Sequence, residues 1–368
     1  MTRATCAPRP TRPMKHNLFL LSSLLLLGAC KKDSAEPTTP TPEGFTPTAV
    51  LNDFAAHVAQ DNYDDLAGLS TGLHDRIVAF STSLSEADLA LCKQQWRDTR
   101  LSWERSEALL FGPVATESID PRIDTWPVNF VDLEAELSSG NAFTAEYITS
   151  LEDALKGFHP IEYLLFGVNG DKTAAQFTAR EIEYIIALAT DLANLTASLD
   201  QRWDPATENN YTTVFSTAGS GSAEYPTQRA AFAELVNAMA GICDEVANGK
   251  MGDVLLAQDP SMEESPFAKN SIVDFTNNIR GVENVYLGRY AADGTGMENF
   301  VREHDLQLDN TIKQQIASSI SALGTITVPF GQAIIEQPVQ VQQAIDAINA
   351  LATTLNEDLL PLVHQHID

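Results

Sequence analysis

The sequence predicts an all-α protein, and three observations lead to this class. Apolar residues recur every three or four positions along most of residues 47–366, which is the period of an amphipathic helix. Helix-start and helix-stop signals divide this pattern into segments of ordinary length. Strand patterns are scarce, because the nearest one, GTITVPF at 324–330, contains a proline that would interrupt a sheet.

The N-terminal segment is predicted to target the chain and not to fold. From Met14, the expected start, it reads MKHNLFLLSSLLLLGAC, a secretory signal pattern that makes residues 1–29 a signal peptide. The apolar run is too short to cross a membrane as a helix. The ending LGAC is similar to a bacterial lipobox, so Cys30 is the expected lipidation site; the alternative is a plain secretory signal with an incidental cysteine. Residues 30–46 are rich in proline, threonine and charge and are expected to form a disordered tether.

The first helical lobe is expected to span residues 47–215. Ser85, followed by Asp88 three residues later, forms a capping box for a helix that stops at Gly112-Pro113. Two prolines break the period in 115–128, which reads as a structured loop. Helices are expected at about 48–82, 85–111, 129–156 with an interruption near SSGNAF, from Pro160 onward, and at 176–202.

The second lobe is expected to span residues 216–368, and the Gly- and Ser-rich stretch 216–226 marks the boundary. Helices are expected at about 227–248, 268–290, 309–322, 330–335, 338–353 and 356–366, with a loop at 291–296. Two domains of roughly 150 residues each are compatible with the chain length.

The chain is strongly acidic, with 50 Asp and Glu against 23 Lys and Arg and a net charge of −27. Such a field repels nucleic acid and argues against a polybasic membrane contact, whereas it attracts cations. The alternative is that acidity only keeps a secreted protein in solution. After Cys30, Cys92 and Cys243 remain; their spacing matches no metal motif, and whether they form a disulfide stays open.

The stretch RLSWERSE places four unusual side chains on one helical face. Arg100, Trp103, Glu104 and Glu107 stand at i, i+3, i+4 and i+7. Two carboxylates three residues apart repel each other unless a cation lies between them. This face predicts ligands for a cation; the alternative is a packed Trp103 with an Arg100–Glu104 pair and a solvated Glu107.

The stretch GFHPIE combines an imidazole and a carboxylate at a helix start. Pro160 suits the first helical turn, so His159 is expected at or just before the N-cap and Glu162 near the third helical position. His and Glu are suitable ligands for zinc, iron or manganese. A zinc peptidase would show HExxH or HxxEH, but the residue after Glu162 is Tyr163. The alternative is a satisfied histidine with a Glu that interacts with the helix dipole.

A third polar segment is ESPFAKNSIVDFTNNIRGVENVYLG, in which Ser271 and Asp274 are expected to form a capping box. The predicted helix carries Asn277, Asn278, Arg280, Glu283, Asn284 and Tyr286. So many polar residues on one helix indicate a face in a polar interface or a cleft, although a well-capped surface helix is the alternative.

Taken together, these segments resemble the imelysin-like family, which is named after a peptidase and includes iron-regulated bacterial lipoproteins. The family hallmark GxHxxE is matched by Gly157, His159 and Glu162. Three further blocks match in order: Trp96, Arg100, Trp103-Glu104, Glu107 and Phe111-Gly112-Pro113; then Ile123-Asp124 and Trp126-Pro127; then Asn270-Ser271, Asp274, Asn278-Ile279, Gly281, Asn284, Tyr286 and Gly288.

The resemblance implies two lobes, each a four-helix-bundle variant, with GxHxxE near their junction. It implies that iron or zinc is bound by His159, Glu162, Glu104 and Glu107, with Asp124 as a further ligand. The polar cluster around this site is expected to include Arg100, Trp103, Trp126, Ser271, Asp274, Asn278 and Tyr286.

Three functions remain open at this point. The first is a lipid-anchored accessory factor in iron uptake that binds a metal ion or an iron complex between its lobes. It would lie on the outer membrane, facing the periplasm or the cell surface, with an uptake receptor as a possible partner. The second is a metallopeptidase that uses His159 and Glu162 as ligands, or Glu162 as general base. The third is an interaction protein whose polar cluster only fixes the lobes.

Overall fold

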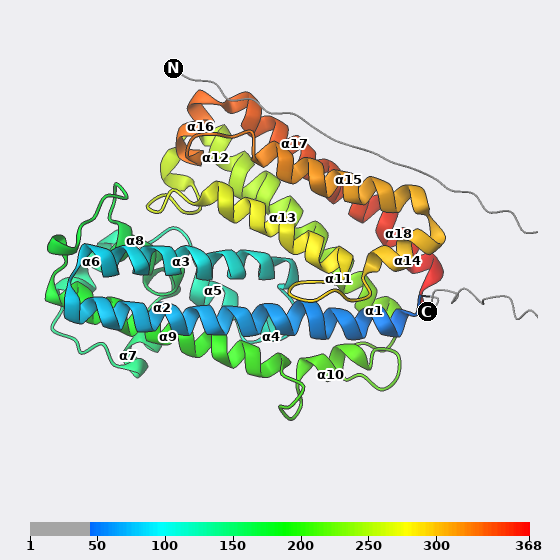
Figure 1. The fold of residues 1–368 in the computed structure, drawn as a ribbon, viewed down its shortest axis with the longest axis horizontal. Helices are drawn as coiled ribbons and strands as arrows, with labels where there is room; N and C mark the ends of the chain where they lie inside the picture. Colours follow the sequence, from blue (N-terminus) through cyan, green and yellow to red (C-terminus); the bar gives the residue numbers. More distant parts are fainter. Residues whose placement is uncertain (1–44) are drawn as a thin grey trace, which may run out of the picture. The chain divides into compact units, whose positions relative to one another are not determined.

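The computed structural model describes residues 45–368, and helices dominate throughout this part of the chain (Figure 1). No strand is assigned within it; a single isolated bridge joins Arg289 and Asp293. The predicted all-α class is therefore confirmed. The signal peptide, Cys30 and nearly all of the tether lie outside the described residues.

The first group of helices is built around α2 (Asp61–Ser83), which packs between α3 (Glu86–Ser106) and α9 (Ala179–Trp203) (Figure 1). A π-helix, Ala55–Gln60, joins α1 (Pro47–Phe54) to α2 without a break. The remaining elements of this group are short: Glu107–Leu109, α4 (Pro113–Thr116), α5 (Ile119–Asp124), α6 (Phe130–Ser138), α7 (Ala145–Ser150), Asp153–Leu155, α8 (Phe158–Phe166), Ala174–Gln176 and α10 (Tyr211–Ser216).

The second group packs around α17 (Pro338–Thr354), which contacts α11 (Gln228–Asp244) and α15 (Leu306–Leu323), while α13 (Ser271–Leu287) contacts α11 and α15. A π-helix, Glu245–Asp253, extends α11 into α12 (Val254–Ala257). The other elements are Pro260–Met262, α14 (Met297–His304), α16 (Phe330–Glu336), the π-helix Leu355–Leu359 and α18 (Leu360–His366).

The two groups meet where α3 packs against α13. The two helices approach each other closely at Gly281, which has no side chain. A Cβ at this position would lie 2.3 Å from the Arg105 carbonyl oxygen. Residues 45–368 form one compact unit by their contacts. The predicted lobe boundary near 216 stays a prediction.

Several local predictions can be compared with the helix ends. Ser85 caps α3 as expected, since its side chain accepts a hydrogen bond from the Asp88 N–H at 3.1 Å. The reciprocal half of the predicted capping box is wrong, because the Ser85 N–H donates to Ser83 Oγ at 3.3 Å. The expected loop 115–128 instead contains the second half of α4 and all of α5, because Pro113 and Pro121 fall in first turns, where no N–H is needed. Helix α14 was not predicted.

The predicted capping box at the start of α13 is wrong. The residue before the helix is Asn270, and its side-chain amide donates to Asp274 Oδ1 at 2.7 Å. Ser271 faces the preceding loop, where its hydroxyl accepts from the Ser265 N–H at 3.1 Å and donates to Glu263 at 2.8 Å. The serine therefore fixes the loop and not the first turn of the helix.

Helix α9 is rich in apolar residues because one of its faces is buried in the core. Among the described residues it is the one helix long and apolar enough to cross a membrane, by length and composition only, and 44% of its most apolar stretch is buried within the protein. Its buried positions include Tyr184, Leu188 and Leu192. The two described cysteines, Cys92 on α3 and Cys243 on α11, are buried and unpaired.

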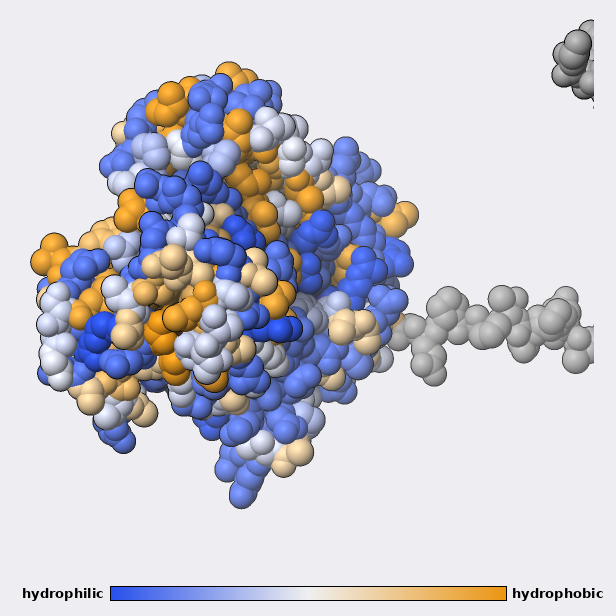
Figure 2. Space-filling model, turned by 60° about the vertical axis from the view of Figure 1, so that its left-hand side comes forward, coloured by the Kyte–Doolittle hydropathy of each residue, from blue (hydrophilic) through white to orange (hydrophobic). Residues whose placement is uncertain are grey.

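The surface viewed in Figure 2 is mainly hydrophilic, with hydrophobic residues in separate patches. Such scattered apolar exposure is ordinary for a folded protein.

Gly157 sets the start of α8 and contradicts the expected position of His159. With φ at +82°, Gly157 is the N-cap, and the helix already begins at Phe158. His159 and Glu162 are thus both inside the helix, three residues apart on one face. The expectation that His159 lies at or before the N-cap is wrong, because only a glycine permits so early a turn into the helix.

Replacing Gly157 by alanine is expected to destabilise the fold by about 2–4 kcal/mol. A Cβ there would lie 2.2 Å from the Ile123 carbonyl oxygen, in addition to the strain of the positive φ. Chemical denaturation measures the change in the free energy of unfolding. Gly68→Ala in α2 is the control, since nothing lies within 4 Å of its Cβ; it should be neutral or stabilising by up to ~1 kcal/mol. Equal stability of the two variants would contradict the role given to Gly157.

Candidate metal centre

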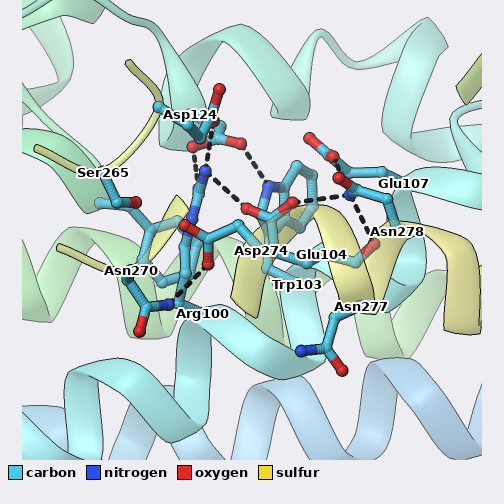
Figure 3. Close-up of polar contacts among 12 residues, drawn as sticks. Arg100, Trp103, Glu104, Glu107, Asp124, Ser265, Asn270, Asp274, Asn277 and Asn278 are labelled. Carbon is cyan, nitrogen blue, oxygen red and sulfur yellow. Dashed lines mark hydrogen bonds and ion pairs between the residues drawn. The ribbon is translucent and has the colours of Figure 1, made fainter. Parts of the chain in front are cut away.

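Charged side chains and one asparagine are buried together where α3 and α13 meet the segments around residues 124, 159 and 264. The members, some of which are labelled in Figure 3, are Arg100, Glu104, Glu107, Asp124, His159, Glu162, Lys250, Glu264, Asp274 and Asn278. Burying charges is unfavourable unless they are paired and hydrogen-bonded. The contacts of each side chain therefore decide what the cluster can do.

Arg100 lies at the centre of the cluster and is completely buried. Its guanidinium pairs with Asp124, with Glu104 Oε1 at 2.6 Å and with Glu264 Oε1 at 2.5 Å. These three carboxylates come from α5, α3 and the loop before α13. One guanidinium thus joins three separate segments of the chain.

Asp124, the last residue of α5, is shared by three partners. Besides Arg100, its Oδ1 lies 3.1 Å from His159 Nε2, and its Oδ2 accepts a hydrogen bond from Trp103 Nε1 at 2.6 Å (Figure 3). Burial opposes ionisation of Asp124, but Arg100 and His159 outweigh it and hold its pKa well below the ordinary value. Asp124 is therefore an ionised carboxylate at neutral pH.

His159 is held between carboxylates on both sides of its ring. Nδ1 lies 3.4 Å from Glu162 Oε2, and Nε2 lies 3.1 Å from Asp124 and 3.8 Å from Glu264 Oε1. The Trp126 ring packs against the imidazole at a centroid distance of 5.0 Å. Burial disfavours the imidazolium, but the adjacent carboxylates of Asp124 and Glu162 raise the pKa of His159 to about 9.

Glu162 is the inner support of this imidazole. Its other oxygen, Oε1, accepts a hydrogen bond from the Ala268 N–H at 2.7 Å, and the side chain is fully buried. A carboxylate behind a ligating histidine fixes the orientation of the ring and raises its basicity. Glu162 thus has the position of a group that could support His159, and its predicted role as a ligand stays a prediction.

Glu104 and Glu107 share a second set of partners (Figure 3). The Asn278 side-chain amide donates to Glu104 Oε2 at 2.7 Å and to Glu107 Oε2 at 2.6 Å, and Lys250 Nζ lies 2.9 Å from Glu107. Burial raises the pKa of Glu104 to about 8 despite Arg100 nearby. Burial and the neighbouring Glu104 hold the pKa of Glu107 well above its usual range.

Among residues 45–368, two groups of side chains have the geometry to hold a metal ion. One consists of Asp124, His159 and Glu264, and the other of Glu104, Glu107 and Asp124; in each, one donor atom per residue lies within 4.8 Å of the others. In the first group, His159 Nε2 is buried and makes no hydrogen bond of good geometry. An imidazole with two carboxylates suits iron, manganese or zinc. The residues therefore fit such an ion.

A cavity of about 310 Å³ lies beside these groups. Its lining residues are Glu107, Asp120, Asp124, Trp126, Glu245, Gly249, Lys250, Met262 and Glu264. Burial, together with Asp124, raises the pKa of Asp120 to about 6. Asp124 and Glu264 both line this cavity, so a solute that enters it can reach them. Most of the charged residues in the lining are acidic.

The structure brings together most of the residues that the sequence nominated. Arg100, Trp103, Trp126, Asp274 and Asn278 lie in or beside the cluster, and Ser271 is one layer away, bonded to Glu263. Tyr286 does not belong to it, because its hydroxyl donates to Asp309 at 2.9 Å within the second helix group. Tyr286 stands twelve residues after Asp274, about 18 Å further along α13.

Sequence reasoning missed Glu264 and Lys250. Glu264 opens the third polar segment, but a loop residue has no helical face on which a pattern could place it. Lys250 stands in a π-helix with no polar pattern around it. Only the fold shows that Lys250 lies beside Glu107 and Glu264, and that Glu264 pairs with Arg100.

Fold and site together define a class: all-α proteins with a buried histidine–carboxylate cluster where two groups of helices meet. The imelysin family model matches residues 59–357, and this chain belongs to that family. Iron-regulated protein A of Synechococcus elongatus is 32% identical over 345 residues, which cover 92% of this chain and 90% of that protein.

Two solved structures share the fold. One, assigned as an iron-regulated protein A precursor from Parabacteroides distasonis, has a TM-score of 0.79 at 24% identity and covers 88% of this chain and 96% of that one. An imelysin-like protein from Psychrobacter arcticum has a TM-score of 0.68 at 15% identity, covering 86% and 95%. The expected membership in the imelysin-like family is confirmed.

The metal-free protein is expected to lose stability as pH rises from about 6.5 to 8. In this window the folded state retains protons on Glu104 and His159 that the unfolded state, with ordinary values of about 4.3 and 6.5, has released. The melting temperature in EDTA should fall by ~5 °C or more. Glu104→Gln removes one of these retained protons, so the melting temperature of this variant should fall less steeply with pH. A melting temperature that is constant or rises over this window would contradict the assignment.

Proposed function

We propose that this imelysin-family chain captures an iron ion, or a cation of similar preference, as an accessory factor in iron uptake. Asp124, His159 and Glu264 would hold the ion, and Glu162 would orient His159. The observation that carries the proposal is the convergence of a buried imidazole nitrogen, which contacts Asp124 without good hydrogen-bond geometry, and two carboxylates beside an acidic cavity. The name of the Synechococcus relative, iron-regulated protein A, supports iron as the ion.

The proposed location is the outer membrane, facing the periplasm or the cell surface. The support is the LGAC sequence ending at Cys30 and the polar stretch that follows it, both in the sequence outside the described residues. A tether of this kind would keep the metal site close to an uptake receptor, which is the proposed partner. The charge of −27 argues against nucleic acid.

Capture suits this site better than peptide hydrolysis. Among the described residues, the candidate ligand groups contain a single histidine, whereas zinc peptidases with HExxH use two. Glu162 is poorly placed as a general base, because it is fully buried and bonded to the Ala268 N–H and His159. A purely structural cluster is the remaining alternative, and metal content distinguishes it from capture.

His159→Ala and Glu264→Ala are each expected to abolish binding of one equivalent of iron. Elemental analysis gives the metal content of protein purified without a metal-binding tag. Calorimetric titration with Fe²⁺ under anaerobic conditions then gives the stoichiometry and affinity of binding. His304→Ala is the control, because His304 and His366 are exposed and stack at 4.1 Å, so they could bind metal adventitiously. Unchanged metal content in both site variants would leave the cluster with a structural role only.

Glu162→Gln is expected to weaken Fe²⁺ binding by about 10–100-fold without abolishing it. The amide can still accept from the Ala268 N–H but no longer holds a charge against the imidazole. The same titration gives the ratio of dissociation constants. A loss as complete as that of His159→Ala would make Glu162 a direct ligand, contrary to its position here.

A further inference from the structure

Lys250 differs from every other residue that lines the cavity. Five of the lining residues are acidic, namely Glu107, Asp120, Asp124, Glu245 and Glu264, and Lys250 is the one base among them. Its Nζ lies 2.9 and 3.2 Å from the two oxygens of Glu107 and 3.5 Å from Glu264 Oε1. An ammonium group thus stands on the cavity wall at the edge of the candidate ligand group.

Arg100 also neutralises Glu264, but its role is different. Arg100 does not line the cavity, is completely buried, and joins three carboxylates through a rigid planar group. Lys250 is attached through a flexible four-carbon chain, and its side chain is 10% exposed. Of the two basic groups, only Lys250 could leave its carboxylates by rotation of side-chain bonds toward the cavity.

We propose that the ammonium group of Lys250 is an exchangeable counter-ion of the cation site, and that Lys250 sets the site's selectivity for ionic charge. This inference rests on the proposed function. Glu264 Oε1 lies 3.8 Å from His159 Nε2 and 3.5 Å from Lys250 Nζ, so an ion bound to Glu264 and His159 would be close to a positive charge. Like charges at such distances repel strongly away from bulk water.

The consequence is that an ion needs more than one positive charge to replace the ammonium group with a gain in charge neutralisation. A monovalent ion that replaced the ammonium group would bring no additional charge to the carboxylates, whereas a divalent or trivalent ion does. Lys250 would therefore keep sodium and potassium out of the site, while ions of higher charge could still displace its ammonium group at a cost in affinity. The π-helix Glu245–Asp253 is consistent with this role, since such wide turns are frequent at functional sites.

The test measures Fe²⁺ affinity of the full-length protein by anaerobic titration after Lys250→Met, which removes the charge and retains the apolar stem. Binding should become tighter by ~10-fold or more. Sodium should compete with Fe²⁺ in this variant but not in the wild type, at ionic strength held constant with a bulky ammonium salt. Lys313→Met is the control, because Lys313 pairs with Asp309 and Glu298 in the second helix group; it should change affinity less than ~2-fold.

A second variant guards against misfolding caused by an unpaired Glu107. Lys250→Met combined with Glu107→Gln removes the pair as a neutral unit and leaves Asp124, His159 and Glu264 intact. If the wild type binds Fe²⁺ and neither variant binds it more tightly, Lys250 only positions Glu264 and the inference is overturned while the proposed function stands. If the wild type binds no Fe²⁺, both fail.

Discussion

The fold around the site depends on the burial of one guanidinium. Arg100 receives a carboxylate from α3, from α5 and from the loop before α13, so the two helix groups and the segment that carries Asp124 are joined through a single side chain. Replacing either partner of a buried ion pair leaves an uncompensated charge, which usually destabilises a protein by several kcal/mol. The cluster is therefore a structural requirement as well as a candidate binding site.

The charge balance of the cluster distinguishes it from an ordinary buried salt bridge. Six carboxyl groups, Glu104, Glu107, Asp124, Glu162, Glu264 and Asp274, are set against Arg100, Lys250 and His159. The excess acid is held protonated, as the raised pKa values of Glu104 and Asp274 indicate. A multivalent cation offers a second way to neutralise the same excess, and its binding would release protons. Cation capture and protonation are thus alternatives at the same site.

Local patterns predicted the helices and the face of α3, because Arg100, Trp103 and Glu104 are placed relative to one another by helical geometry alone. The partners of this face could not be predicted in the same way. Glu264 and Lys250 reach it through tertiary packing, and no periodicity in the sequence records that contact. His159 was misplaced at the helix start because the positive φ of Gly157 moves that start toward the N-terminus.

The close approach of Gly157 to Ile123 has a consequence for how the family could vary. Residues 125–156 form an excursion that begins immediately after Asp124 and ends immediately before Gly157 and the helix that carries His159, and the backbone contact closes this excursion at its base. Closing a longer loop is only slightly less favourable, by about 0.6 kcal/mol for each doubling of length. The excursion is therefore an insertion point, where segments of different length or sequence could adapt the rim of the cavity to different partners without moving Asp124 and His159.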